Sequence, residues 1–128
     1  MSRSLFDLDP RFAPLAEELL RQSEQAGVPL AIIDTLRTPE EHAANLATGV
    51  SWIKHSKHLD GLAIDVCPVD LLHKKGWAPQ HRDWQVAGRI GELLGLRWGG
   101  RWAQRDMAHF EYVEPPRSDR PIEAMGES

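Results

Sequence analysis

The sequence has little of several features that would assign it to particular protein classes. It contains one cysteine, Cys67, which excludes an internal disulfide, and we expect this residue to be small and buried. Lys and Arg form no run, and the formal net charge is −4, so neither a nucleic-acid partner nor simple adhesion to an anionic surface is favoured. No apolar stretch reaches membrane-spanning length, so stable membrane insertion is not expected.

The composition that remains is that of an ordinary globular protein. A chain of 128 residues with 41% hydrophobic and 27% charged residues fits one modest core. We predict a single domain over residues 1–113 and a flexible tail over residues 114–128, because the tail lacks apolar periodicity. We expect a monomer. The polar beginning of the sequence contains no apolar signal core, so we expect synthesis in the cytoplasm without a signal peptide.

Apolar periodicity and turn residues divide the chain into short helices and strands. Asp9 and Pro10 resemble a helix start, and Gly27 resembles its end. Neighbouring strands late in the chain favour an α+β fold, in which helices pack on a small antiparallel sheet. The expected helices cover residues 10–26, 38–48 and 81–94, and the expected strands cover residues 29–36, 61–66, 96–99 and 108–113.

The stretch Ser-Lys-His-Leu-Asp-Gly-Leu-Ala-Ile-Asp, at residues 56–65, is the most informative part of the sequence. Read as a strand entered from a loop, it places its large apolar side chains on one face. Gly61, Ala63 and Asp65 lie on the other face, where two very small residues would leave open space. His58 could turn into that space beside Asp65.

A second His and a second Asp follow much later, in Asp106-Met107-Ala108-His109. Two imidazoles and one carboxylate are a typical ligand set for a catalytic zinc, so we predict that His58, Asp65 and His109 bind Zn²⁺. Other divalent ions could occupy such a site. Asp106 is then the predicted general base. Glu111 is its rival, and it could instead hold His109 in position from the same strand face.

The pattern Ser-x-His-x-x-Gly-x-Ala-x-Asp followed by Asp-x-x-His resembles the zinc D-alanyl-D-alanine carboxypeptidase and L-alanyl-D-glutamate endopeptidase family. This family includes phage endolysins and shares its fold with the hedgehog signalling domain. The resemblance covers roughly residues 30–112 and implies the same α+β fold. It implies an acidic residue at the place of Asp106 and, from an Arg-Thr-Pro-Glu-Glu segment, a substrate-binding Arg37. Ser56 carries over as a hydrogen-bonding residue for substrate.

The resemblance also implies a function: a zinc metallopeptidase that hydrolyses the stem peptides of bacterial peptidoglycan. The endolysin type, which cuts between L-alanine and D-glutamate, is the best match, and it would act on the cell wall after release from the cytoplasm. Two alternatives stay open, a D-Ala-D-Ala carboxypeptidase or dipeptidase and a non-catalytic, zinc-containing cell-wall-binding module. His42 and His55 depart from the family pattern and bear on specificity, while Trp98 and Trp102 are candidates for the wall of the cleft.

Overall fold

The computed structural model of the protein describes residues 4–35 and 60–114, and the structural statements below refer to these ranges. The predicted helix over residues 38–48 lies outside them, and so does the predicted tail apart from Glu114. The division into one domain and a tail therefore stays a prediction. Within the described ranges no helix has the length and apolar character needed to cross a bilayer.

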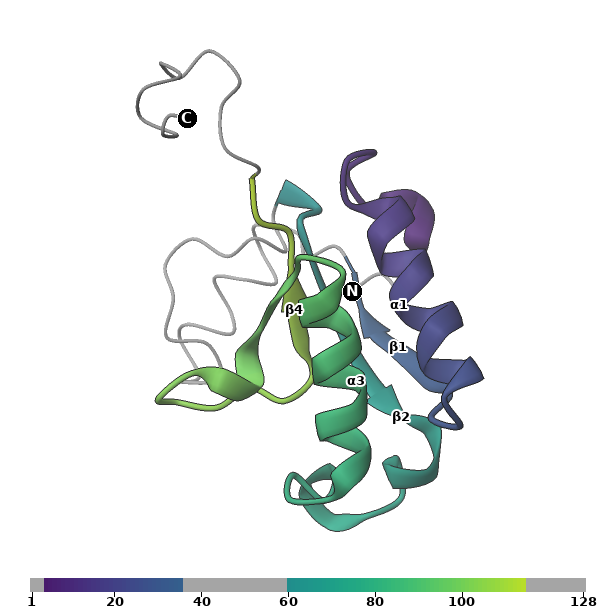
Figure 1. Cartoon of the computed structure of the whole chain (residues 1–128), viewed down its shortest axis with the longest axis vertical. Helices are drawn as coiled ribbons and strands as arrows, with labels where there is room; N and C mark the ends of the chain where they lie inside the picture. The colour runs from purple at the N-terminus through teal and green to yellow at the C-terminus, as the bar shows by residue number, and fades with distance from the viewer. Residues whose placement is uncertain (1–3, 36–59, 115–128) are drawn as a thin grey trace.

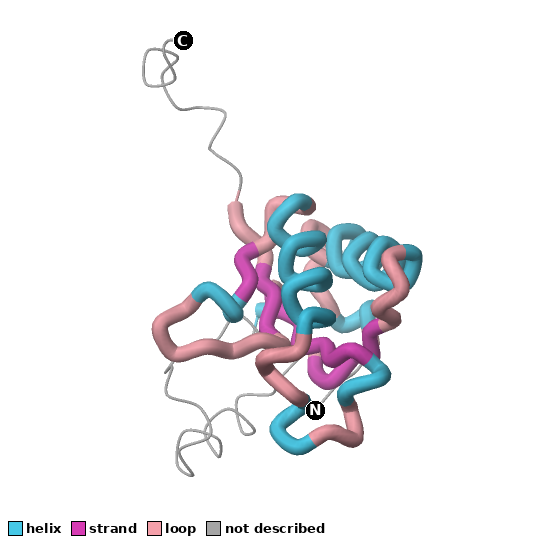
Figure 2. Tube along the Cα trace, turned by 60° about the horizontal axis from the view of Figure 1, so that its bottom comes forward, coloured by secondary structure: helices cyan, strands magenta, loops and turns pink. Residues whose placement is uncertain are grey.

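Four short strands form one antiparallel sheet with the order β1-β2-β4-β3. Two α-helices, α1 and α3, lie side by side over one face of this sheet (Figures 1 and 2). The predicted α+β class is thereby confirmed. The helices are α1 (Ala13–Gln25) and α3 (Arg82–Leu93), and the strands are β1 (Leu30–Asp34), β2 (Ala63–Pro68), β3 (Arg97–Trp98) and β4 (His109–Glu111).

Asp9 makes the contacts predicted for a helix start, in a turn over residues 9–13. Its carboxylate accepts the backbone N–H of Arg11 at 2.8 Å, and its carbonyl accepts the N–H of Ala13 at 2.9 Å. Its own N–H donates to the carbonyl of Gly61 at 2.9 Å and so ties this turn to the entry of β2. Regular helix begins only at Ala13. The predicted end at Gly27 is confirmed, since this residue has a φ of +88° directly after the last turn.

The core lies between the helices and the sheet. Ile64 and Val66 of β2 are fully buried, as the alternation predicts. The opposite face of β2 is less open than expected, because Ala63 and Cys67 are also fully buried and only Asp65 is partly exposed. Burial raises the pKa of the Cys67 thiol to about 11, which fits the predicted role of this cysteine as a small buried residue.

Helix α3 approaches the sheet closely through two glycines. A Cβ atom added at Gly88 would lie 2.4 Å from the Cε3 atom of Trp98, and one added at Gly91 would lie 2.5 Å from the Cε2 atom of Phe110. The two aromatic rings stack on each other with centroids 6.3 Å apart. Close contact of α3 therefore fixes the positions of β3 and β4, which flank the site described below.

We expect Gly88→Ala to destabilise the fold. Alanine favours a helix over glycine by about 1 kcal/mol, but the added methyl group would overlap a tryptophan that is only 2% exposed, and such overpacking costs about 1–3 kcal/mol. The free energy of unfolding from urea titration should fall. Gln85→Ala, on an exposed position of the same helix, is the control and should leave it nearly unchanged. Equal or greater stability of Gly88→Ala would contradict the proposed close approach.

Candidate metal centre

The pairing of β2 with β4 brings together two of the predicted site residues. Asp65 and His109 are direct partners in the antiparallel register, so their side chains project from the same face of the sheet. The Oδ1 atom of Asp65 lies 3.3 Å from the Nδ1 atom of His109. Asp65 is partly exposed, whereas His109 is buried.

Asp106 reaches the same place from the turn that precedes β4. Its backbone N–H donates to the carbonyl of Gly99 at 3.0 Å, and its carbonyl accepts the N–H of His109 at 3.2 Å. Asp65, Asp106 and His109 each offer one potential ligand atom, and these three atoms lie within 4.8 Å of one another. The structure thus places the predicted base beside two predicted ligands, while the role of each residue stays a prediction.

Glu111 occupies the far side of the His109 ring. Its Oε1 atom lies 2.8 Å from His109 Nε2, and both side chains are buried. A carboxylate can only accept, so Nε2 carries the proton and Nδ1 faces Asp65. Arg97, from the neighbouring strand β3, lies 3.5 Å from the second oxygen of Glu111. Of the two roles open to Glu111 from the sequence, this position fits the orientation of His109 rather than a base.

The charge state of His109 follows from these contacts. Burial lowers the pKa of this imidazole. The hydrogen bonds that its N–H groups donate to Asp65 and Glu111, together with the negative charges of Asp65 and Asp106, outweigh burial and raise the pKa from 6.5 to about 9. Without a cation, His109 therefore carries a proton on both ring nitrogens at neutral pH and is positively charged. A divalent cation would satisfy the same carboxylates and would take the place of that proton.

The donor set fits a metal ion. One imidazole nitrogen and two carboxylates are ligands that zinc accepts, and the buried Glu111 behind the imidazole is an arrangement typical of zinc-binding histidines. Asp65 and His109 can hold the ion with either a third ligand from elsewhere or Asp106 itself. The third predicted ligand, His58, lies outside the described residues, as do the predicted substrate-binding residues Arg37 and Ser56.

Sequence reasoning missed the role of Gly99. A Cβ atom at this position would lie 2.4 Å from the carbonyl oxygen of Asp106 and 3.2 Å from the Cβ atom of His109. Only a residue without a side chain lets the Asp106 turn close over the end of β3. The Gly99-Gly100 pair is visible in the sequence, but the need for glycine at position 99 becomes clear only when the Asp106 backbone is seen to pack against it.

The two tryptophans that flank this glycine pair differ in position. Trp98 is 2% exposed, and its indole N–H donates to the carbonyl of Met107 at 2.8 Å, so it is a core residue. Trp102 is half-buried, and its ring centroid lies 5.0 Å from that of His109. Of the two candidates for the cleft wall, only Trp102 lies beside the candidate metal centre and remains accessible.

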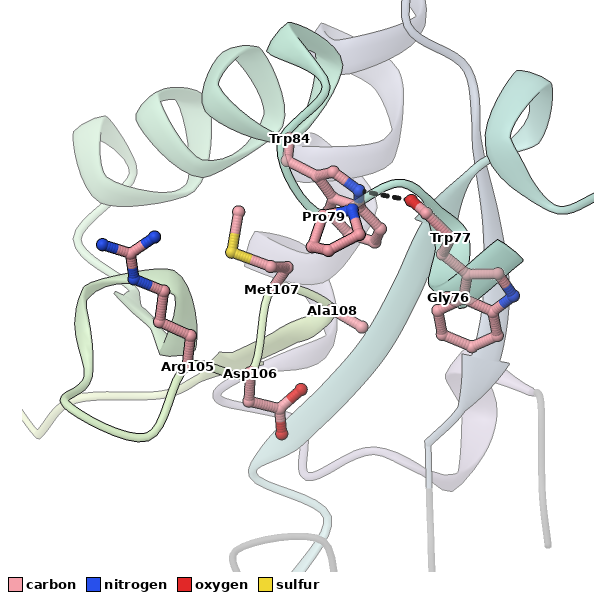
Figure 3. Close-up of a pocket in the computed structure, with 8 residues that line it drawn as sticks. All are labelled: Gly76, Trp77, Pro79, Trp84, Arg105, Asp106, Met107 and Ala108. Carbon is pink, nitrogen blue, oxygen red and sulfur yellow. Dashed lines mark hydrogen bonds between the residues drawn. The ribbon is translucent and has the colours of Figure 1, made fainter. Parts of the chain in front are cut away.

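A pocket of about 200 Å³ opens next to Asp106. Figure 3 shows the residues around it, which come from the loop before α3, from α3 itself and from the segment leading into β4. They are Gly76, Trp77, Pro79, Trp84, Arg105, Asp106, Met107 and Ala108.

An antiparallel sheet under two helices, with a His–Asp pair on adjacent strands and a further carboxylate beside it, is the framework of a metal-dependent hydrolase. The chain belongs to the family described as D-alanyl-D-alanine carboxypeptidase, whose pattern matches residues 49–112. The resemblance noted in the sequence is therefore confirmed, and the chain is a member of a family of peptidases.

Individual relatives agree with this assignment. The L-alanyl-D-glutamate peptidase of Escherichia phage T5 is 30% identical over 117 residues, which cover 85% of this chain and 82% of the relative. The L-alanyl-D-glutamate peptidase of Listeria phage A118 is 34% identical over 93 residues, or 69% of this chain, but the chain spans only 31% of that relative's length. The crystal structure of the Serratia marcescens L-Ala D-Glu endopeptidase ChiX aligns with a TM-score of 0.64 and 25% identity, covering 88% of this chain and 87% of that one.

We expect Glu111→Gln to weaken metal binding without unfolding the protein. A neutral amide orients the His109 ring less firmly than a carboxylate and makes its Nδ1 atom less basic. Loss of such a partner typically costs about 10- to 100-fold in metal affinity. The dissociation constant for zinc, measured by competition with a chelator, should rise by that factor. Glu114→Gln, which removes an exposed carboxylate just beyond the same strand, is the control and should bind zinc normally. Equal affinities would contradict the role of Glu111.

We also expect metal uptake to release a proton. Because the pKa of His109 is raised to about 9 in the metal-free site, zinc must displace a proton at pH 7 but not well above pH 9. The apparent affinity should therefore rise about tenfold per pH unit between pH 7 and 9. Calorimetry in two buffers with different ionisation enthalpies measures the proton count. A count of zero at pH 7, with an affinity independent of pH, would contradict this protonation of His109.

Proposed function

We propose that this protein is a zinc-dependent peptidoglycan peptidase that hydrolyses the bond between L-alanine and D-glutamate in the stem peptide. The observation that carries the proposal is the convergence of Asp65, Asp106 and His109, whose ligand atoms lie within 4.8 Å of one another. Two relatives bear the name L-alanyl-D-glutamate peptidase, and the similar ChiX structure is an L-Ala D-Glu endopeptidase. Its target would be the bacterial cell wall, reached after release from the cytoplasm.

In this proposal Asp65 and His109 are ligands, together with His58 from the sequence motif. A bound zinc ion would supply a more acidic water molecule and a more electrophilic scissile carbonyl. Glu111 keeps the His109 ring oriented, so that Nδ1 points to the ion and Nε2 keeps its proton. Trp102 shields the imidazole from one side and limits the access of bulk water.

Asp106 is the proposed general base. It is exposed, unlike the buried Glu111, so a water molecule and a substrate can both reach its carboxylate. Its place in the turn before β4 is fixed by the hydrogen bond to Gly99 and by the contact of the two backbones. Asp106 would take a proton from the attacking water and then give it to the nitrogen of the departing amine. Because Asp106 gives this proton to the departing amine, the residue that departs must lie on the Asp106 side of the site.

The two alternatives remain distinct. A D-Ala-D-Ala carboxypeptidase or dipeptidase would use the same ligands and base on another bond, and the printed name of the family favours it. The names of the individual relatives favour the endopeptidase. A non-catalytic wall-binding module would not need an exposed carboxylate beside the metal ligands, and the position of Asp106 therefore favours an enzyme.

We expect the zinc-loaded protein to digest purified cell wall and to create new N-terminal glutamate. Only hydrolysis of the L-Ala–D-Glu bond gives this terminus, because the nitrogen that Asp106 protonates belongs to the glutamate. Mass spectrometry of the soluble products after terminal labelling identifies it. Release of free D-alanine would show instead that the protein is a carboxypeptidase.

Two variants separate metal binding from proton transfer in the same assay. Asp106→Asn should retain zinc and lose about two to four orders of magnitude in rate, the usual contribution of a general base. His109→Ala should lose both the zinc and the activity. If Asp106→Asn loses its zinc, Asp106 is a ligand; if it digests wall normally, another residue is the base.

A further inference from the structure

The connection from β2 to α3 has a charge opposite to that of the rest of the chain. Residues 69–82, which we call the basic loop, lie at one end of the molecule (Figure 1). They contain three basic residues, Lys74, Lys75 and Arg82, against one acidic residue, Asp70, which gives a formal charge of +2. Since the whole chain carries −4, the residues outside the loop carry −6. The net charge that argued against adhesion to an anionic surface therefore conceals a region of the opposite sign.

The cations of the basic loop are exposed and are not neutralised by neighbouring carboxylates. Lys74, Lys75 and Arg82 are all exposed, and among the described residues none of the three has a side-chain hydrogen bond or an ion pair. Arg101, by contrast, is paired with a glutamate 2.9 Å away. The positive charge of the loop is therefore available to an anionic partner outside the molecule.

Exposed apolar side chains accompany these charges along the loop. Val69 is 44% exposed and Leu72 is 39% exposed, and Trp77, which follows the two lysines, is half-buried. A soluble polyanion offers only negative charge. A bilayer of anionic lipids offers negative charge at its surface and hydrocarbon directly beneath, with a boundary at which tryptophan is enriched. The combination of basic and apolar side chains thus fits a lipid surface better than a soluble polyanion.

Contacts with the core hold the basic loop in one shape. The backbone N–H of Val69 donates to the carbonyl of Pro29 at 2.9 Å. The indole N–H of Trp84, which is 1% exposed, donates to the carbonyl of Trp77 at 2.8 Å (Figure 3). Trp77 and Ala78 have left-handed φ values of +59° and +48°, a conformation that persists only where the surrounding structure enforces it. Little backbone ordering would therefore be needed when the loop binds a surface.

We infer that the basic loop binds the surface of membranes that contain anionic phospholipids. Its two lysines and its arginine lie at the lipid phosphates, and Val69 and Leu72 enter the interfacial layer while no part of the chain spans the bilayer. Each basic residue near such a surface strengthens binding about fivefold, so three of them give a weak, reversible and salt-sensitive attachment. The inference does not depend on the proposed function, because Asp65, Asp106 and His109 lie outside the loop.

Sedimentation with sucrose-loaded vesicles measures this attachment for the full-length, zinc-loaded protein. Vesicles of phosphatidylglycerol and phosphatidylcholine in equal parts are compared with vesicles of phosphatidylcholine alone. At low salt we expect the partition coefficient on the anionic vesicles to be at least about tenfold higher, because only these attract the cations of the loop. The difference should disappear in about 0.5 M NaCl, which screens the attraction. Equal partitioning at low salt would overturn the inference.

Paired charge variants show whether the basic loop is the binding surface. Lys74→Gln/Lys75→Gln should bring the partition coefficients on the two kinds of vesicle close to each other, since each lysine contributes about fivefold. Arg21→Gln/Arg89→Gln removes the same charge from exposed positions on α1 and α3 and should keep most of the difference. Thermal unfolding checks that both variants are folded. If the two pairs reduce binding equally, net charge and not the loop governs attachment, and the inference fails.

An apolar variant distinguishes a lipid surface from a soluble polyanion. Leu72→Asn removes an exposed apolar side chain from the basic loop and should weaken binding to the anionic vesicles about threefold to fivefold. Leu93→Asn, at a leucine that is 73% exposed on α3, is the matched control and should bind as wild type does. If Leu72→Asn also binds as wild type does, and soluble poly(glycerol phosphate) displaces the protein from the vesicles, the loop is a site for polyanions and the assignment to lipid is wrong.

Discussion

The rest of the site depends on the backbone pairing of β2 with β4. Antiparallel register places Asp65 opposite His109, and no side-chain movement is needed to bring the carboxylate and the imidazole together. Each strand is in turn held by other elements, β2 by its pairing with β1 and β4 by the stacked Trp98 and Phe110 under α3. The geometry of the candidate metal centre, as far as the described residues show it, is therefore a property of the sheet, to which the turn before β4 adds the carboxylate of Asp106.

The contacts of His109 suit both the metal-free site, in which the imidazole is protonated, and a site that holds a cation. Asp65 and Glu111 lie on its two nitrogens, and with Asp106 they surround it with negative charge. In the absence of a cation a proton balances this charge, and in its presence the cation does so. The two states need the same positions of the carboxylates, so the fold can be complete before the metal arrives.

Part of this site was predictable from the sequence because its signals are local. Alternation along residues 61–66 identified a buried strand and put Asp65 on the face opposite Ile64, and the spacing of Asp106 and His109 placed both at one strand entrance. The helix end at Gly27 was predictable for the same reason. The first residue of regular helix in α1 was not, because Pro14 has no N–H with which to continue the turn that Asp9 begins, and regular helix starts only at Ala13.

Other features could not be predicted from the sequence because they depend on which distant residues face them in the folded chain. Glu111 had two possible roles until the direction of the His109 ring was known. The importance of Gly99 follows from the Asp106 backbone that covers it, and the pocket follows from a left-handed conformation that neither Trp77 nor Ala78 favours by itself.

The placement of the Asp65–His109 pair has a mechanical consequence. The two residues belong to strands that are far apart in the sequence, so a cation held between them would join the first half of the chain to the last strand of the sheet. Such a link closes a long loop and opposes the separation of β4 from β2, in the way that a covalent crosslink would. The ion would then add a side-chain link to the backbone pairing of β4, a three-residue strand that lies between β2 and β3.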